Sequence, residues 1–207
     1  IDSAAFSLED KSYFIRRIGS DGFKISHQPT MKKVVNDRRA SLDEETEIKP
    51  AMKIIAEREF RKGASIPIIM FPENGSEVPD SPRLTMVVLS PEIEWTGTGE
   101  LRESISKWMV KRGDSGRLYP GSLVWCVRKK GKELRDKVEL WLAWRRVAQE
   151  VGDGTLGADF DRSDRTDIQV KVRDSEEAAQ DEVWGGYRFI IIADNGEKDG
   201  IKPIDLG

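Results

Sequence analysis

Apolar and polar positions alternate near the start of the chain and then change to a helical spacing. Residues 12–26 alternate on both sides of segment 19–22, whose Gly, Ser and Asp residues favour a tight turn, so we predict a β-hairpin. Met31, Val34 and Val35 follow at the i, i+3, i+4 spacing of one helix face. A helix is therefore expected directly after the hairpin.

A second helix is expected over residues 43–62. Its inner face is formed by four apolar residues, Ile48, Met52, Ile55 and Phe60. Pro50 interrupts the pattern, so this helix either kinks or begins there. Residues 63–82 then contain many Gly and Pro residues, which leave room for no regular element apart from the short apolar run 66–71. We place a domain boundary in this linker.

Beyond the linker, apolar runs of strand length alternate with helical patterns. The expected strands cover residues 84–89, 122–127 and 187–193, and the expected helices cover residues 99–112, 132–151 and 162–183. Strands separated by helices predict α/β units with a mostly parallel sheet. The predicted class is mixed α/β, with a small α+β module over residues 1–62, a linker over 63–82, and an α/β domain with long flanking helices over 83–207.

Charge is divided unevenly along the chain. Charged residues make up 34% of the sequence, and the formal net charge is −3. Residues 11–39 nevertheless carry far more basic than acidic side chains, which indicates a small basic module joined to an acidic body. No apolar run has the length of a membrane span, and a single cysteine fits a reducing compartment. We therefore expect a cytoplasmic protein with no membrane partner.

The basic module is the strongest functional signal in the sequence. A hairpin beside a helix rich in Lys and Arg offers contiguous charge to a nucleic-acid backbone, as the wing and helices of winged-helix domains do. The candidate nucleic-acid-binding residues are Arg16, Arg17, Lys24, Lys32, Lys33, Arg38 and Arg39. The alternative is that these side chains pair with the acidic body or with a neighbouring domain.

Candidate residues for nucleophilic catalysis and for zinc binding are few. The chain has one His and one Cys, which do not suffice for the usual four-ligand zinc sites. Cys126 lies in an expected strand, so we interpret it as a packing residue. His27 is interpreted as a turn or surface residue. The sequence therefore predicts no catalytic residue.

Metal and phosphate chemistry have only weak candidates. Four acidic residues offer oxygen ligands for Mg²⁺ but are more typical of a helix N-terminal region: Asp159, Asp161, Asp164 and Asp167. Gly97-Thr98-Gly99 precedes an expected helix, as anion-binding loops do, but lacks the Lys and Ser/Thr of a phosphate loop. No Walker A pattern occurs in the chain. We therefore predict no metal site and no cofactor.

Four strings of the chain look similar to one known family. Ser12–Arg39, Val78–Glu92, Leu118–Val151 and Ala178–Asp194 resemble an uncharacterised-domain family of large prokaryotic AAA-type ATPases. Members tend to occur beside restriction, methylation and phage-defence genes. The Walker motifs of that family lie N-terminal to the segment that these strings match. The resemblance implies a region that follows the ATPase module, with a winged-helix-like piece and an α/β domain of unknown role.

The preferred functional hypothesis joins the resemblance to the basic module. It describes a non-catalytic fragment of a large ATPase that contacts DNA or RNA, or regulates the ATPase. Its partners would be DNA, the upstream ATPase module of the same parent chain, and a protein. Ile1 is not an initiator Met, which fits a segment of a longer protein. Two alternatives stay open: a protein-interaction scaffold, and a Mg²⁺-dependent hydrolase or nuclease.

Overall fold

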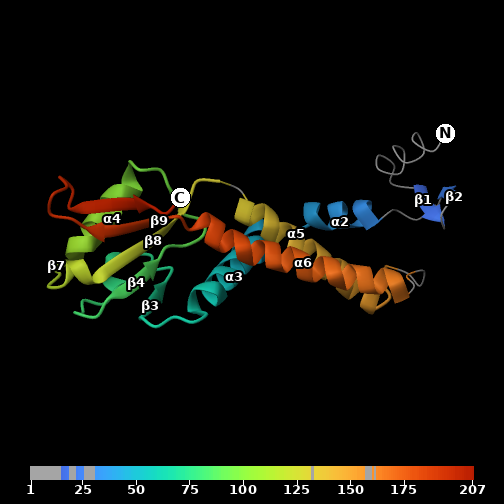
Figure 1. The fold of residues 1–207 in the computed structure, drawn as a ribbon, viewed down its shortest axis with the longest axis horizontal. Helices are drawn as coiled ribbons and strands as arrows, with labels where there is room; N and C mark the ends of the chain where they lie inside the picture. Colours follow the sequence, from blue (N-terminus) through green and yellow to red (C-terminus); the bar gives the residue numbers. More distant parts are fainter. Residues whose placement is uncertain (1–14, 19–21, 26–30, 132, 157–159, 161) are drawn as a thin grey trace. The chain divides into compact units, whose positions relative to one another are not determined.

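The chain divides into two compact units. The computed structural model describes residues 15–18, 22–25, 31–131, 133–156, 160 and 162–207. One unit combines residues 1–44 with 139–176, and the other combines residues 45–138 with 177–207. Helices α5 (Glu133–Gly152) and α6 (Arg162–Gly186) have residues in both units (Figure 1). No helix in the described part of the chain is long and apolar enough to cross a membrane.

The first unit contains the predicted hairpin and the helix after it. Strand β1 (Ile15–Ile18) pairs antiparallel with β2 (Gly22–Ile25), and α2 covers Met31–Ala40, so both predictions are confirmed. Val34 and Val35 are buried in one apolar cluster with residues of α5 and α6. The other buried members of this cluster are Ala143, Val147, Val151 and Ile168. Helix α2 is therefore held against α5 and α6 by apolar residues that recur at helical spacing along one of its faces.

The second unit is built from helices, turns and a mixed sheet. A π-helical turn (Glu44–Ile48) leads into α3 (Lys49–Arg61), and a second α-helix, α4, covers Glu100–Val110. The strands are β3 (Ile68–Met70), β4 (Thr85–Val88), β5 (Glu94–Trp95), β8 (Leu123–Lys129), β9 (Phe189–Ala193) and β10 (Ile201–Asp205). A small hairpin consists of β6 (Lys111–Arg112) and β7 (Ser115–Gly116). Two 3₁₀ turns cover Gly75–Glu77 and Pro120–Ser122.

The sheet combines parallel and antiparallel pairs. Its order is β10-β9-β8-β4-β3, with β5 paired to the end of β8. Strands β3, β4, β5 and β8 pair in parallel, whereas β9 is antiparallel to both β8 and β10. The fold is therefore mixed α/β as predicted.

The direction of β9 follows from the helices that precede it. Helix α5 begins four residues after β8 ends. The last residue of α6, Gly186, lies beside Arg128 of β8, as a Cβ added to this glycine would be 3.2 Å from Arg128 Cγ. The chain thus re-enters the sheet near the end that it left. A strand that starts there runs back along β8, and Val127 is opposite Phe189 in the register. A single crossover helix, by contrast, gives a parallel strand.

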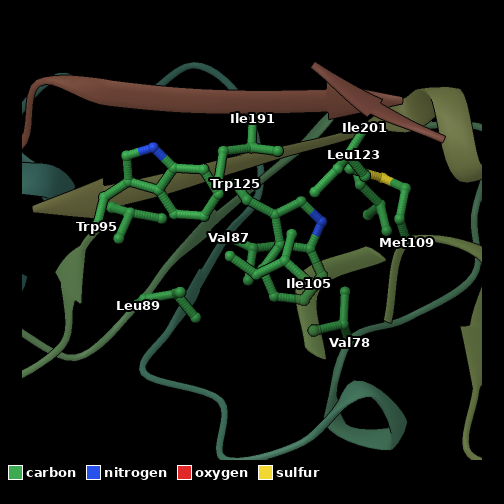
Figure 2. Close-up of a cluster of buried hydrophobic side chains, with 11 residues drawn as sticks. Val78, Val87, Leu89, Trp95, Ile105, Met109, Leu123, Trp125, Ile191 and Ile201 are labelled. Carbon is green, nitrogen blue, oxygen red and sulfur yellow. The ribbon is translucent and has the colours of Figure 1, made fainter. Parts of the chain in front are cut away.

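The core of the second unit lies between the sheet and α4. Strand β8 buries Leu123, Trp125 and Val127 on this face with a period of two. Ile105 and Met109 of α4 are fully buried against them, and Figure 2 shows the side chains gathered around Trp125. The Trp125 ring also stacks on that of Trp108 at a centroid distance of 5.7 Å.

Helix α3 agrees with the predicted apolar face. Ile48, Met52, Ile55 and Phe60 are all buried. Pro50 lies in the first turn of α3, where the missing N–H breaks no intrahelical hydrogen bond. Helix α3 therefore begins one residue before this proline, at Lys49, directly after the π-helical turn.

The segment expected to be a linker contributes to the sheet. Strand β3 lies inside residues 63–82 and pairs in parallel with β4, with Ile69 opposite Val87. The two compact units also differ from the predicted division into residues 1–62, 63–82 and 83–207. The physical reason is that α2 finds its apolar partners on α5 and α6, far away in the sequence.

Candidate nucleic-acid interface

The hairpin places two of the predicted basic residues opposite each other. Arg16 is the register partner of Lys24, and Arg17 is the partner of Phe23. Residues directly opposite in an antiparallel pair belong to the same face of the hairpin, where like charges destabilise the pairing. The register therefore places two basic positions directly opposite each other in the hairpin.

Helix α2 separates its apolar face from its basic residues. Val34 and Val35 are buried, whereas Lys32 is exposed. Lys33 Nζ lies 3.7 Å from Asp37 Oδ2 one turn further along, an exposed pair that contributes little to stability. The amphipathic pattern thus keeps the lysine ammonium groups away from the apolar cluster.

Arg38 and Arg39 at the end of α2 bind carboxylates of α5. Arg38 Nε donates to both carboxylate oxygens of Glu150 at 2.8 Å, and its Nη2 lies 2.8 Å from Oε2. Arg39 Nη2 donates to Glu139 Oε2 at 3.0 Å. For these two arginines the structure agrees with the alternative interpretation, in which basic residues pair with acidic residues of the same chain.

A hydrogen bond adds to the contact between these helices. Arg146 Nη1 of α5 donates to Ser41 Oγ at 3.0 Å, and Ser41 Oγ donates to the Arg38 carbonyl. The end of α2 is thus joined to α5 by side chains, and the Ser41 side chain is in turn bonded to the backbone of α2.

The structure agrees with the interpretation of Cys126 as a packing residue. Cys126 is buried in β8, and burial raises the pKa of its thiol to about 12, because a thiolate loses its hydration there. A thiol with so high a pKa is a poor nucleophile at neutral pH. His27 lies outside the described residues.

The acidic candidates are only partly described. Asp164 and Asp167 are exposed on α6, and Asp164 lies in its first turn, as expected for a residue that complements the helix dipole. Asp159 and Asp161 lie outside the described residues. Among the residues that are described, no group of three or more His, Cys, Asp or Glu side chains is arranged to hold a metal ion.

The Gly97-Thr98-Gly99 loop borders a surface pocket beside α4. Gly99 caps the helix with φ of 80°, and no side chain caps the helix start. The pocket measures about 470 Å³ and is lined by Thr98, Gly99, Arg102, Glu103, Ser106, Lys107, Val110, Lys111 and Asp199. Arg102 donates to Asp199 at 2.6 Å and to the Gly97 carbonyl, and its hydrogen bond lowers the pKa of the Asp199 carboxyl. The guanidinium is thus committed to joining two loops.

Two arginines that are buried in the structure were not identified from the sequence. Arg117 donates to the carbonyls of Gly75, Val78, Pro79 and Trp108. Arg128 donates to the Pro91 carbonyl and to Glu94. Both arginines have sequence neighbours like those of exposed arginines, so nothing in the sequence indicated that they would be buried.

The comparisons with known proteins add no relative. No protein-family model matches the chain, and no curated protein or solved structure matches it significantly. Evidence for a function therefore comes from the chain's own residues.

Proposed function

We propose that the chain is a non-catalytic segment of a large prokaryotic AAA-type ATPase of the phage-defence type, and that its basic module contacts DNA or regulates the ATPase. The β1–β2 hairpin and α2 would act as the wing and a helix of a winged-helix-like module. The upstream ATPase module of the parent chain would be one partner. The unit that contains the sheet would serve as an interaction domain.

The observation that carries this proposal is the register of the hairpin. It places Arg16 opposite Lys24, with Arg17 next in the strand. Two like charges in directly opposed positions destabilise a two-stranded ribbon, which is only marginally stable by itself. A bound phosphate backbone would remove that repulsion and release counterions. The hairpin is therefore better suited to a polyanion than to a neutral or cationic partner.

Equilibrium binding of a fluorescent DNA duplex across a salt series tests the proposal. The triple variant Arg16→Gln, Arg17→Gln, Lys24→Gln is expected to bind at least about tenfold more weakly at low salt. Its plot of log affinity against log salt is expected to be shallower by about 2–3 units, close to 0.9 for each phosphate that the variant no longer neutralises. Both effects should be the same for unrelated DNA sequences, because interactions with the backbone carry no sequence information.

A matched control removes three cations elsewhere. Lys49 and Lys53 lie near Glu92, and Arg61 pairs with Glu57, all in the other unit. The variant Lys49→Gln, Lys53→Gln, Arg61→Gln therefore changes the net charge equally and is expected to bind nearly as well as the wild type. Absence of binding by the wild type at low salt, or equal losses of affinity in both variants, would contradict the proposal.

A protein-interaction role is the second candidate, and one loop favours it. Leu118 is 80% exposed, and its neighbour Tyr119 is also exposed. The loop that carries Leu118 is fixed, because Asp80 accepts hydrogen bonds from the amides of Leu118 and Tyr119 at 2.8 and 3.0 Å. Apolar side chains on a rigid loop lose little entropy when they bind a partner. Salt-dependent DNA binding distinguishes the two candidate functions.

A further inference from the structure

Two of the candidate DNA-binding residues already hold an anion within the protein. Arg38 binds Glu150 with Nε and Nη2, and Arg39 binds Glu139, both on α5. The guanidinium group presents its N–H donors as a planar fork, which fits a carboxylate and a phosphate in the same way. A DNA phosphate would therefore use the donors that these carboxylates now occupy.

We infer that Glu139 and Glu150 mask Arg38 and Arg39 from DNA, so that phosphates must displace the two carboxylates before these arginines take part in binding. This inference rests on the proposed function, and it concerns the regulation of the same interface. It assigns a regulatory role to two acidic residues of α5 that do not themselves bind DNA. Two more phosphates would be bound only when the two ion pairs open.

The exposure of the four side chains allows this exchange. Arg38 and Arg39 side chains are 29% and 34% exposed, whereas those of Glu150 and Glu139 are 19% and 15% exposed. The arginine side chains are therefore more accessible to an approaching phosphate than the glutamate side chains are. Ion pairs that remain partly in contact with water are weak and are screened by salt. Displacement of the carboxylates thus requires no change in the buried core.

Apolar contacts hold α2 in place while the ion pairs exchange. Val34 and Val35 are each only 5% exposed, in a cluster with Ala143 and Val147 of α5. Burial of such side chains contributes more to stability than partly exposed ion pairs do. Only the two ion pairs change between the masked and the unmasked state, and α2 stays packed on α5 in both.

The test compares salt-dependent DNA binding of the wild type with that of the variant Glu139→Gln, Glu150→Gln. Glutamine keeps the length of the side chain but carries no charge to compete with a phosphate. The variant is expected to bind duplex DNA at least about tenfold more tightly at low salt. Its salt plot is expected to be steeper by about 1.8 units, because two additional phosphates are neutralised.

Two further variants separate unmasking from a general change in charge. The quadruple variant Arg38→Gln, Arg39→Gln, Glu139→Gln, Glu150→Gln is expected to return to the wild-type salt slope, because no arginine is left to be unmasked. The variant Glu57→Gln, Glu92→Gln removes two ion-paired carboxylates of the other unit and is expected to leave the slope unchanged. A gain in affinity that persists in the quadruple variant, or appears in this control, overturns the inference.

A measurement on the wild type avoids any dependence on the folding of variants. The NMR signal of the Arg38 Nε–H group reports its acceptor, and it is expected to keep its position when the wild type binds DNA at low salt, because Glu150 still accepts the hydrogen bond. A clear shift of this signal on DNA binding would overturn the mask but leave the proposed function intact. Failure of the wild type and of Glu139→Gln, Glu150→Gln alike to bind DNA would overturn both.

Discussion

Arg117 shows how a single buried cation can organise loops that are distant in sequence. Arg117 is 8% exposed as a residue, and its guanidinium donates to four backbone carbonyls in two segments, those of Gly75, Val78, Pro79 and Trp108. Burial lowers the pKa of this guanidinium, because the charged form loses hydration. The charge persists at neutral pH, since a guanidinium is always protonated there.

Removal of this guanidinium is expected to destabilise the sheet-bearing unit. Arg117→Gln removes the guanidinium donors from four buried or partly buried carbonyls, so the free energy of unfolding should fall by about 2–4 kcal/mol. Urea denaturation followed by tryptophan fluorescence measures this change. Arg112→Gln is the control, because Arg112 is exposed and donates only to Ser76 among the described contacts. Equal stability of the two variants would show that the four hydrogen bonds contribute little.

At the residue scale the sequence predicted the positions of charge but not its partners. Val34 and Val35 could be assigned to an apolar face because their spacing fits one turn of a helix. Arg38 and Arg39 were recognised as basic, but Glu150 lies 112 residues from Arg38 and Glu139 lies 100 residues from Arg39. Nothing local in the sequence specifies a side-chain contact over such a separation.

At the scale of single elements, the start of α4 depends on a glycine. Gly99 has φ of 80° and ψ of −164°, a conformation that is almost restricted to glycine, and its position has open space around it. Gly99→Ala is expected to lower the free energy of unfolding by about 1–3 kcal/mol through backbone strain alone.

Gly121→Ala provides the matched comparison for Gly99→Ala in urea denaturation. A Cβ at Gly121 also meets no atom, but this glycine is not among those with positive φ. The substitution should leave stability unchanged or raise it slightly, since alanine restricts the unfolded chain. Equal effects at both positions would argue against strain at the start of α4.

Helices whose apolar residues recur at a regular spacing were predicted well, whereas strand β10, which depends on pairing with β9, was not. Helices α4, α5 and α6 lie close to the predicted ranges because their apolar residues recur at helical spacing. Strand β10 was not predicted, because Pro203 interrupts a short run in which apolar residues alternate with Lys202 and Asp205. The proline is tolerated there because β10 is an edge strand, which among the described strands pairs with β9 alone.

At the scale of the whole molecule, each unit is assembled from separate stretches of sequence. Residues 1–44 form a unit with residues 139–176, and residues 45–138 form one with residues 177–207. The sequence suggested a boundary where Gly and Pro accumulate, which is a local signal. The observed division depends on which helices pack together, and that information is spread along the chain.

This division predicts that residues 1–62 do not fold as an isolated fragment. Helix α2 would lack Ala143 and Val147, so its buried face would be exposed to water. Circular dichroism of the fragment should show little helix and no cooperative thermal transition. A chimera that joins residues 1–44 to 133–182 through a long Gly/Ser linker should recover a cooperative transition. Cooperative unfolding of the fragment alone would restore the predicted independent module.

The separation between α2 and its partners also has a consequence during protein synthesis. A ribosome that adds about 5–20 residues per second needs roughly 6–20 s to make the 112 residues between Arg38 and Glu150. During that interval the nascent chain carries Val34 and Val35 without their apolar partners and Arg38 without its carboxylate. Helix α2 is then open to chaperones, and its arginines are open to ribosomal RNA, until α5 emerges from the exit tunnel.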